Sequence, residues 1–292
     1  MASLKEIKGR IAGTTSTQKV TSAMKMVASS KLSKARLQVS SFSPYESKLA
    51  EILNTFLLSS DVEIDNELVK EREVKRVAIV VISSNSGLCG AFNINVQKLL
   101  AERMKHFQHL GESNIELYPL GKKITECIFK NYSSNPVNTT YSRLIDNPDF
   151  NGAKELGQKL IQDFTDKKID KVEILYNHQK SNAVQLPTID QLLPIVLEKK
   201  ETGQALKTDY IIEPNKKAVL DSLIPKSLFN KIYLEFMDSM VAEYAARMVA
   251  MQIATDNATD LLDELNVQYN KQRQQKITNE LLDIVGGSEA LR

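Results

Sequence analysis

The chain has 292 residues, of which 42% are hydrophobic and 25% are charged, and its formal net charge is +2. These totals exclude a disordered chain and bulk electrostatic attraction to a polyanion. Two cysteines, Cys89 and Cys127, are too few for a secreted disulfide framework, and neither a signal-peptide pattern nor a run of about 20 apolar residues occurs. We therefore expect a soluble, globular, intracellular protein with reduced thiols.

The first predicted element is a long helix over residues 1–58. Apolar residues from Met24 to Phe42 recur mostly at three- and four-residue intervals, which is the spacing of one helix face. Two early glycines and Pro44 are the only potential breaks. Residues 59–76 then alternate in charge and carry few apolar side chains, which is typical of a linker.

The middle of the chain, residues 77–210, predicts a Rossmann-like α/β domain. Strands are predicted by the runs RVAIVVIS, IELYPLG and KVEILYN, and helices by NINVQKLLAERMKHF, KKITECIFKN and AKELGQKLIQDF. Alternating strands and helices indicate a mostly parallel sheet covered by helices. The last apolar run contains Pro187 and Pro194, so it fits an edge strand or hairpin better than a central strand.

The last segment, residues 211–292, predicts a second long helix, because no glycine or proline occurs from Lys226 to Val285. As one helix this stretch would extend about 90 Å, whereas a compact chain of this length is only about 40 Å across. Its apolar residues follow alternating steps of three and four. The positions of this seam are Leu234, Met237, Val241, Tyr244, Met248, Met251, Thr255, Ala258, Leu262, Leu265 and Tyr269.

A sustained repeat of 3.5 residues is the signature of a left-handed coiled coil. The N-terminal helix is the only other segment long enough to be the partner strand. We therefore predict a long antiparallel two-helix coiled coil, formed by the N- and C-terminal helices, plus the central α/β domain. Small residues at the interface, among them Ala28, Ala35 and Ala258, would let the two helices approach closely.

The sequence offers little support for catalysis. The loop SSNSGLCGAFN lacks the glycine spacing of phosphate-binding motifs, and no histidine stands at a motif spacing from Cys89. His106 and His109 lack further metal ligands at a suitable spacing, and the acidic residues between Asp256 and Glu264 fit a hydrated helix face. We predict a packed turn at the loop, and no catalytic, cofactor-binding or metal-binding residue.

The N-terminal helix is strongly basic. Its first 42 residues contain Lys5, Lys8, Arg10, Lys19, Lys25, Lys31, Lys34 and Arg36, against the single acid Glu6. Charge alone leaves three interpretations open: a nucleic acid, acidic loops of a protein partner, or a solvated helix face. A coiled-coil nucleic-acid-binding protein with an α/β domain, or an α/β enzyme, is thus an alternative function.

Four separated motifs resemble one family. The stretches KEIKGRIAGTTSTQKVTSAMKMVASSKLSKA, SSNSGLCGAFN, ARMVAMQIATDNATDLLDEL and YNKQRQQKITNELLDIVGG are similar to those of the gamma subunits of F-type ATP synthases, in the same order. The resemblance implies a coiled coil inside a ring of alternating alpha and beta subunits. It also implies an α/β head on the epsilon subunit and on the membrane ring of c subunits. Proton flow would turn this non-catalytic central-stalk rotor and couple its rotation to ATP synthesis or hydrolysis.

The resemblance also implies partner-contact residues. The basic region of the first helix matches the part that meets acidic loops of beta, polar residues of the last helix match further beta contacts, and the C-terminal end matches the tip held in an apolar sleeve. The expected contacts are Met24, Lys25, Val27, Lys31, Lys34, Arg36, Arg247, Asp256, Asn257, Asp260, Gln274, Thr278, Glu280, Leu282, Ile284, Val285 and Leu291.

Two departures from the family pattern stand out. Asn85-Ser86 replaces a common Asp-Arg pair, and Ser288 stands where alanine is usual. A redox-regulatory insertion with paired cysteines is missing, which argues against the chloroplast form. The resemblance therefore implies a bacterial protein, held through its partners on the cytoplasmic face of the inner membrane, with no nucleic acid as a partner.

Overall fold

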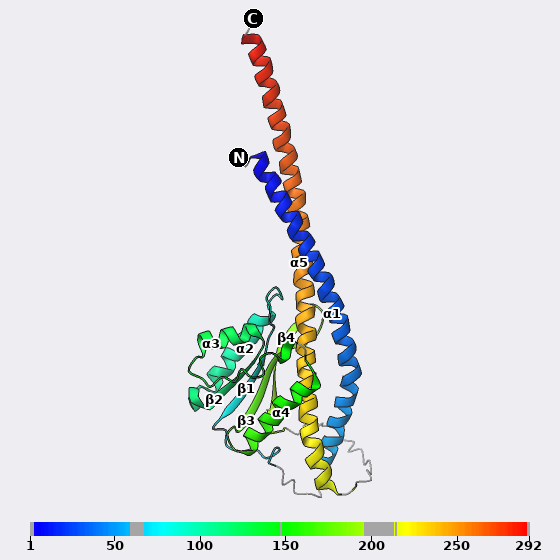
Figure 1. The fold of residues 1–292 in the computed structure, drawn as a ribbon, viewed down its shortest axis with the longest axis vertical. Helices are drawn as coiled ribbons and strands as arrows, with labels where there is room; N and C mark the ends of the chain where they lie inside the picture. Colours follow the sequence, from blue (N-terminus) through cyan, green and yellow to red (C-terminus); the bar gives the residue numbers. More distant parts are fainter. Residues whose placement is uncertain (1–2, 59–66, 147, 196–212, 214, 291–292) are drawn as a thin grey trace. The chain divides into compact units, whose positions relative to one another are not determined.

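The computed structural model describes residues 3–58, 67–146, 148–195, 213 and 215–290 (Figure 1). Its main elements in chain order are α1 (Leu4–Leu58), β1 (Val77–Ile82), α2 (Phe92–His106), β2 (Ile115–Leu120), α3 (Lys122–Asn131), α4 (Phe150–Thr165), β3 (Lys171–Gln179), β4 (Gln185–Leu193) and α5 (Lys216–Ala290). Short 3-10 turns lie at Gln108–Leu110, Glu112–Asn114 and Leu144–Asp146. The predicted combination of two long terminal helices and a central α/β sheet is confirmed.

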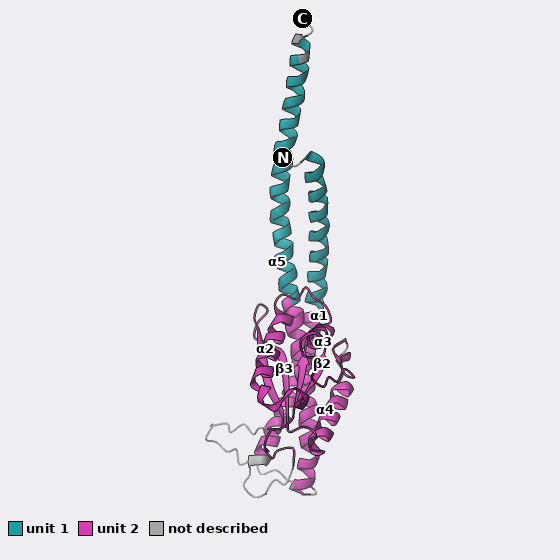
Figure 2. Ribbon diagram, turned by 90° about the vertical axis from the view of Figure 1, so that its left-hand side faces the viewer, with its two compact units in different colours: residues 1–30, 247–292 teal, residues 31–246 magenta. Residues whose placement is uncertain are grey.

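The chain divides into two compact units (Figure 2). The smaller unit contains residues 1–30 and 247–292, and the larger unit contains residues 31–246. Helices α1 and α5 therefore each contribute one segment to each unit. The domain boundaries expected at residues 58, 76 and 210 stay predictions.

The sheet of the larger unit has four strands in the order β2-β1-β3-β4. β1 pairs in parallel with both β2 and β3, whereas β4 pairs antiparallel with β3. All of β1 is buried, because a parallel sheet of this kind is covered on both faces. β4 is the last strand in the order and contains Pro187, which confirms the predicted edge strand.

The two faces of the sheet carry separate apolar cores, because side chains alternate along a strand. Val77, Ile79 and Val81 pack with apolar residues of α2 and α3 on one face. Ala78 and Val80 pack on the other face with residues of α4 and with α1 and α5. The sheet is thus held between helix layers, as the alternating pattern of strands and helices predicts.

In the larger unit, α5 begins at Lys216 and contains Pro225, so it starts ten residues before the glycine- and proline-free stretch that marked it in the sequence. This part of α5 carries a second apolar stripe with a spacing of four residues. The members of this stripe, which belong to the core on the α4 face of the sheet, are Leu220, Ile224, Leu228, Ile232 and Phe236.

In the smaller unit, α1 and α5 pack side by side and run antiparallel (Figure 2). The Gln18 amide donates to the Thr259 hydroxyl at 2.8 Å, and the Thr255 hydroxyl lies 2.9 Å from that of Thr21. In successive contacts between the helices, the residue number therefore increases along α1 as it decreases along α5, as expected for an antiparallel pair. Met251, Ala258 and Leu265 of the predicted seam are buried, which confirms its phase.

A Thr255→Val substitution tests the polar contact within this helix pair. Valine keeps the branched shape but removes the hydroxyl that meets Thr21, so we expect the free energy of unfolding to fall by about 1 kcal/mol. Urea unfolding of the full chain measures this change. Thr17→Val is the matched control, because the exposed Thr17 hydroxyl bonds to the Gly13 carbonyl of its own helix; equal losses in the two variants would contradict the interhelical contact.

Candidate partner-contact surfaces

The place where open α/β sheets bind nucleotides is filled by the chain itself. Such ligands lie outside the carboxyl ends of the strands where the strand order reverses, which here is between β1 and β3. Cys89 and Phe92, each 1% exposed, pack there with Ala242 and Ala246 of α5. The Asn177 amide at the end of β3 donates to the Phe92 carbonyl at 2.9 Å. These contacts use the crevice for packing between the β1–α2 loop, β3 and α5.

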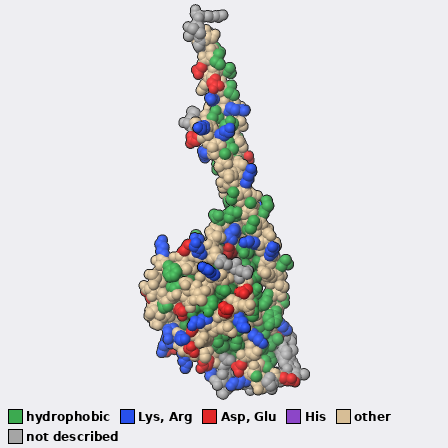
Figure 3. Space-filling view, in the orientation of Figure 1, with side chains coloured by type: hydrophobic (Ala, Val, Ile, Leu, Met, Phe, Trp, Pro, Cys, Tyr) green, Lys and Arg blue, Asp and Glu red, His purple; other side chains and the backbone are tan. Residues whose placement is uncertain are grey.

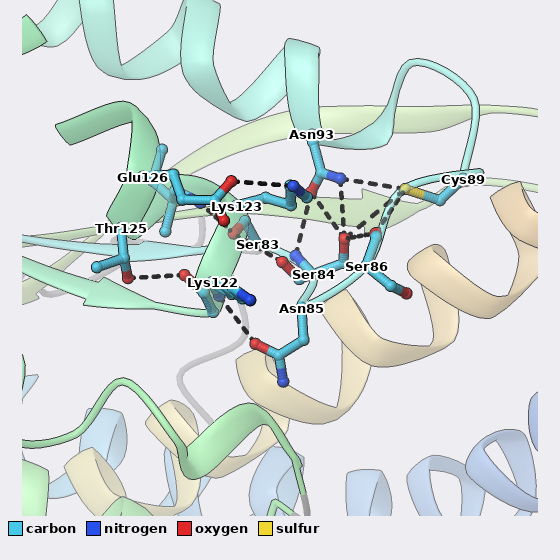
Figure 4. A network of polar contacts seen from close by, with 12 residues as sticks. Ser83, Ser84, Asn85, Ser86, Cys89, Asn93, Lys122, Lys123, Thr125 and Glu126 are labelled. Atoms are coloured by element: carbon cyan, nitrogen blue, oxygen red, sulfur yellow. Dashed lines mark hydrogen bonds and ion pairs between the residues drawn. The ribbon is translucent and has the colours of Figure 1, made fainter. Parts of the chain in front are cut away.

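The loop between β1 and α2 is a packed turn, as predicted. The Asn93 amide donates to the Ser84 hydroxyl at 2.8 Å and contacts the Cys89 sulfur at 3.2 Å, and the Ser84 hydroxyl donates to the Ser86 carbonyl at 2.6 Å (Figure 4). The recorded polar contacts of Cys89 are with Ser84, Ser86 and Asn93. Among the described residues no histidine is in contact with the thiol, so these contacts are those of a packed side chain and not of a base-activated nucleophile.

Asn85, one of the two departures in this loop, holds the start of α3. The Lys122 backbone N–H donates to the Asn85 side-chain oxygen at 2.8 Å, and the Ile124 N–H donates to the Ser83 hydroxyl at 3.0 Å (Figure 4). These bonds satisfy donors in the first turn of the helix, which have no partner within it. An asparagine here supplies the same acceptor that an aspartate would, without its charge.

The basic segment predicted in α1 is exposed where it lies in the larger unit. Lys31, Lys34 and Arg36 are all exposed. The Lys31 ammonium lies 5.6 Å from the centre of the Tyr244 ring, and the Arg36 guanidinium donates to the Asn182 side chain. All three side chains are therefore accessible to a partner, and the charged ends of Lys31 and Arg36 also contact neighbouring side chains.

The candidate residues of the smaller unit are spread over both helices. On α1, Met24 and Lys25 are half-buried and Val27 is 58% exposed. On α5, the exposed and half-buried candidates lie outside the buried seam positions: Arg247 is half-buried, and Asp256, Asn257 and Asp260 are exposed. The Gln252 amide donates to the Asp256 carboxylate at 2.7 Å. The helix pair thus presents these side chains outward and keeps its seam inward.

The end of α5 exposes apolar side chains. Every described side chain from Arg273 to Gly286 is exposed, and Leu282, Ile284 and Val285 are 64%, 68% and 59% exposed. Figure 3 shows hydrophobic side chains at the surface of this end. Leu291 lies outside the described residues. Because exposed apolar side chains concentrated on one segment mark an interaction site, this end is the clearest candidate contact surface.

Polar candidates accompany that apolar end. The Thr278 hydroxyl donates to the Gln274 carbonyl at 3.0 Å, and Lys276 and Glu280 form an ion pair at 3.5 Å. Both contacts are local to α5, so they leave the outer surface of the helix available.

Sequence reasoning omitted several exposed apolar residues from the contact set. Val20, Met26 and Leu37 of α1 are 55%, 67% and 70% exposed, and Ile277 and Leu281 of α5 are 49% and 57% exposed. Their positions along the helices, outside the buried seam, could have identified them. An apolar residue on a coiled-coil helix that does not belong to the buried seam has to face something else.

The described part of the chain contains no group of three or more histidine, cysteine, aspartate or glutamate residues placed to hold a metal ion. None of its helices is both long and apolar enough to cross a membrane. A packed α/β unit, a long antiparallel helix pair and exposed contact surfaces together define a structural subunit that acts by meeting partner proteins.

Comparisons with known proteins identify the family. The profile of the family described as ATP synthase matches residues 3–291. The ATP synthase gamma chains of Azobacteroides pseudotrichonymphae and Phocaeicola vulgatus are each 49% identical, and the alignments cover 100% and 99% of this chain and 100% of each relative. The chain belongs to the ATP synthase gamma chain family and is therefore a non-catalytic subunit. This assignment replaces the nucleic-acid-binding and enzyme alternatives.

Solved structures share the fold. A chain of the Euglena gracilis mitochondrial ATP synthase, from a structure titled OSCP/F1/c-ring, has a TM-score of 0.63 at 19% identity, with 99% of this chain and 94% of that chain covered. A chain of the Tetrahymena thermophila mitochondrial ATP synthase, from a structure titled central stalk/c-ring, has a TM-score of 0.56 at 21% identity, with 80% and 99% covered.

Proposed function

We propose that this chain is the central-stalk rotor of a bacterial F-type ATP synthase. Rotation of the membrane c-ring, driven by proton flow, would turn it against the alpha and beta subunits and couple that rotation to ATP synthesis or hydrolysis. Membership of the gamma chain family supports the proposal. The single observation that carries it is the apolar end of α5, where Leu282, Ile284 and Val285 are exposed on an unpaired helix. Such a surface suits an apolar sleeve formed by partner subunits.

The proposed contacts with beta use charge and polarity. Lys31, Lys34 and Arg36 would face acidic loops of beta, and Met24, Lys25 and Val27 would extend this contact along α1. On α5, the contacts would be made by Arg247, Asp256, Asn257, Asp260, Gln274, Thr278 and Glu280. Exposed charges on a partner surface mainly set the orientation and the rate of the encounter. A rotating shaft needs such contacts, because they can be made and broken in each step.

The apolar contacts would act as a bearing. Leu282, Ile284, Val285 and Leu291 would lie in the sleeve at the top of the alpha and beta ring. Apolar contact is non-directional, so a sleeve of this kind can hold a helix at many angles without a fixed hydrogen-bond pattern. That property distinguishes a bearing from an ordinary docking site.

The central domain would connect the shaft to the membrane part. We propose that the head, residues 77–210, binds the epsilon subunit and the c-ring, while residues 1–58 and 211–292 form the shaft and residues 59–76 the linker. The chain would then be held on the cytoplasmic face of the bacterial inner membrane through these partners.

Assembly with alpha and beta subunits tests this function. We expect the full chain to copurify with them as one complex, and a bead attached to its α/β unit to rotate when ATP is added. Rotation should stop when ATP is replaced by a non-hydrolysable analogue, which is the control. A complex that hydrolyses ATP without turning the bead, or a failure to form the complex, would contradict the rotor assignment.

A further inference from the structure

A groove along one face of α3 lies apart from the proposed partner contacts. Its volume is about 480 Å³, which is within the range of small-molecule sites, roughly 300–1,000 Å³. The groove is bounded by α3, by the loop after β1 and by the segment that precedes α4. The lining residues that carry its chemistry are Asn85, Lys122, Thr125, Glu126, Phe129 and Arg143. We call it the α3 groove.

The α3 groove follows a single stripe of the helix. Lys122, Thr125, Glu126 and Phe129 stand at positions i, i+3, i+4 and i+7, which share one helix face. Lys122 and Phe129 are therefore about 10 Å apart along the helix axis. Lys122, Glu126 and Phe129 are all exposed. The stripe thus presents a cation, a carboxylate and an aromatic ring in that order.

Two cations lie at the Lys122 end of the groove. The Ser142 carbonyl accepts from the Gly121 N–H at 3.1 Å, which places Arg143 beside the start of α3. The Asn85 side chain, which accepts from the Lys122 N–H (Figure 4), lines the same end. Among the described residues, neither Lys122 nor Arg143 has an ion-pair partner. Cationic donors of this kind bind phosphate or carboxylate oxygens strongly.

The backbone donors at the start of α3 are already used within the protein. The N–H groups of residues 121–124 donate to Ser142, Asn85, Ser84 and Ser83. An anion in the α3 groove is therefore held by the side chains of Lys122 and Arg143, and the end of the helix contributes no free donor of its own.

Glu126 places an acceptor in the middle of the groove. The Lys123 ammonium lies 2.9 Å from its carboxylate, and this hydrogen bond lowers the pKa of Glu126. An ionised carboxylate accepts hydrogen bonds and donates none, so it favours a ligand with hydroxyl groups at this point. In dinucleotide-binding α/β proteins a carboxylate binds the ribose in this way.

Phe129 forms the apolar end of the groove. It is 55% exposed, whereas Ile124 and Ile128 of the same helix are buried in the core. An exposed aromatic ring offers a flat surface on which a nucleic-acid base of any kind can stack.

We propose that the α3 groove binds a nucleoside diphosphate. Lys122 and Arg143 hold the phosphates, and Glu126 accepts from the ribose hydroxyls. The base stacks on Phe129. The order of side chains along α3 thus matches the order of the parts of the ligand, whereas an acidic peptide would bring further negative charge to Glu126.

The place of the groove in the sheet agrees with such a ligand. Asn85 follows β1 and Gly121 follows β2, so the groove lies at the carboxyl ends of two parallel strands, the edge at which open α/β sheets hold ligands. The crevice between β1 and β3, in which α5 packs, lies on the other side of β1. The site is independent of the contacts proposed for the rotor.

Calorimetric titration of the full chain tests the site with three probes: ADP, inorganic pyrophosphate and adenosine. We expect ADP to bind saturably at one site per chain, and about tenfold or more tighter than either fragment, because it engages both ends of the groove at once. The alpha and beta subunits are absent from this titration, so they contribute no binding. Absence of saturable ADP binding, or pyrophosphate binding as tight as that of ADP, would overturn the proposal and leave the rotor assignment untouched.

Two substitutions at exposed positions separate the ends of the groove. Lys122→Gln should weaken the binding of ADP and of pyrophosphate about tenfold, because it removes a charge-assisted contact to phosphate. Phe129→Leu should weaken ADP binding about fivefold or more through lost stacking and leave pyrophosphate binding unchanged. Equal effects of Phe129→Leu on both probes would contradict the placement of the base.

Lys130→Gln is the matched control for the charge. Lys130 is an exposed lysine of the same helix that does not line the groove, so its loss should leave the affinity for ADP unchanged. A loss of affinity as large as that of Lys122→Gln would mean that ADP responds to the net charge of the surface, and it would refute a specific site.

Discussion

Replacing Lys31, Lys34 and Arg36 together by glutamate is expected to lower the rate of rotation-coupled ATP hydrolysis by a factor of about ten or more. These side chains are exposed on α1, and the proposed partner surface on beta is acidic. Reversal turns attraction into like-charge repulsion, which costs several kcal/mol at an interface, and each 1.4 kcal/mol corresponds to a factor of about ten. The measurement is proton pumping driven by ATP in membranes that contain the assembled complex, compared with the rate of ATP hydrolysis.

The control for this triple variant makes the same change in net charge elsewhere. Lys48, Lys217 and Lys226 are exposed lysines of α1 and α5 that belong neither to the proposed beta contacts nor to the head, and their joint replacement by glutamate should leave coupling intact. Raising the salt concentration should narrow the difference between the wild type and the α1 variant, because exposed charges are screened. Full coupling in the α1 variant would show that the basic segment is a solvated face.

Substitution of Gly121 by alanine is expected to destabilise the larger unit by about 3 kcal/mol or more. Gly121 has a φ of +107°, a conformation that residues with a Cβ rarely adopt, and an added Cβ would lie 2.4 Å from the Ser83 carbonyl oxygen. Backbone strain of this kind costs about 1–3 kcal/mol, and overpacking costs about as much again. The obstacle is backbone, so a side-chain rotation cannot relieve it. Urea unfolding of the full chain measures the loss.

The matched control is Gly87→Ala in the neighbouring loop. A Cβ at Gly87 would meet nothing within 4 Å, and the φ of this residue is not in the positive range. We expect a change within about 0.5 kcal/mol. Similar losses at both glycines would mean that the close approach of β1 and β2 loops at Gly121 does not control stability.

The sequence carries enough information for the elements that depend on local pattern. The seam through Met251, Ala258 and Leu265 was readable because a repeat of 3.5 residues persists over many turns. The buried run of β1 was readable because continuous β-branched residues fit a strand covered on both faces. The edge position of β4 followed from Pro187, which cannot donate to a neighbouring strand.

The part of α5 before Pro225 lies within the predicted segment, residues 211–292, but local pattern does not explain why it is helical. A proline within a helix costs about 3 kcal/mol, so Pro225 favours a helix that begins near it. The structure continues the helix to Lys216, and Leu220 and Ile224 before the proline are buried in the core. Each such burial contributes about 1.5–3 kcal/mol, so the two together offset the proline. That gain depends on a sheet distant in sequence.

The burial of Glu235, which is 4% exposed, was equally invisible in the sequence. Glu235 stands next to the seam residue Leu234, where a charged side chain is usually solvated. Its burial arises because this part of α5 packs on two sides, against the seam partner and against the sheet. The candidate contact residues differ from Glu235 in this respect. They were selected by family resemblance, and the exposed fractions of their side chains alone would not have selected them.

The continuity of α5 has a geometric consequence. It is a single helix of 75 residues, and successive residues of an α-helix are related by a rotation of about 100° as well as a rise of about 1.5 Å. Adding or removing one residue after Tyr269 would therefore leave the seam intact but turn Leu282 and Ile284 by more than a quarter of a circle about the helix axis. The number of residues in this segment thus sets an angle, and the direction in which the end of the helix faces is encoded in its length.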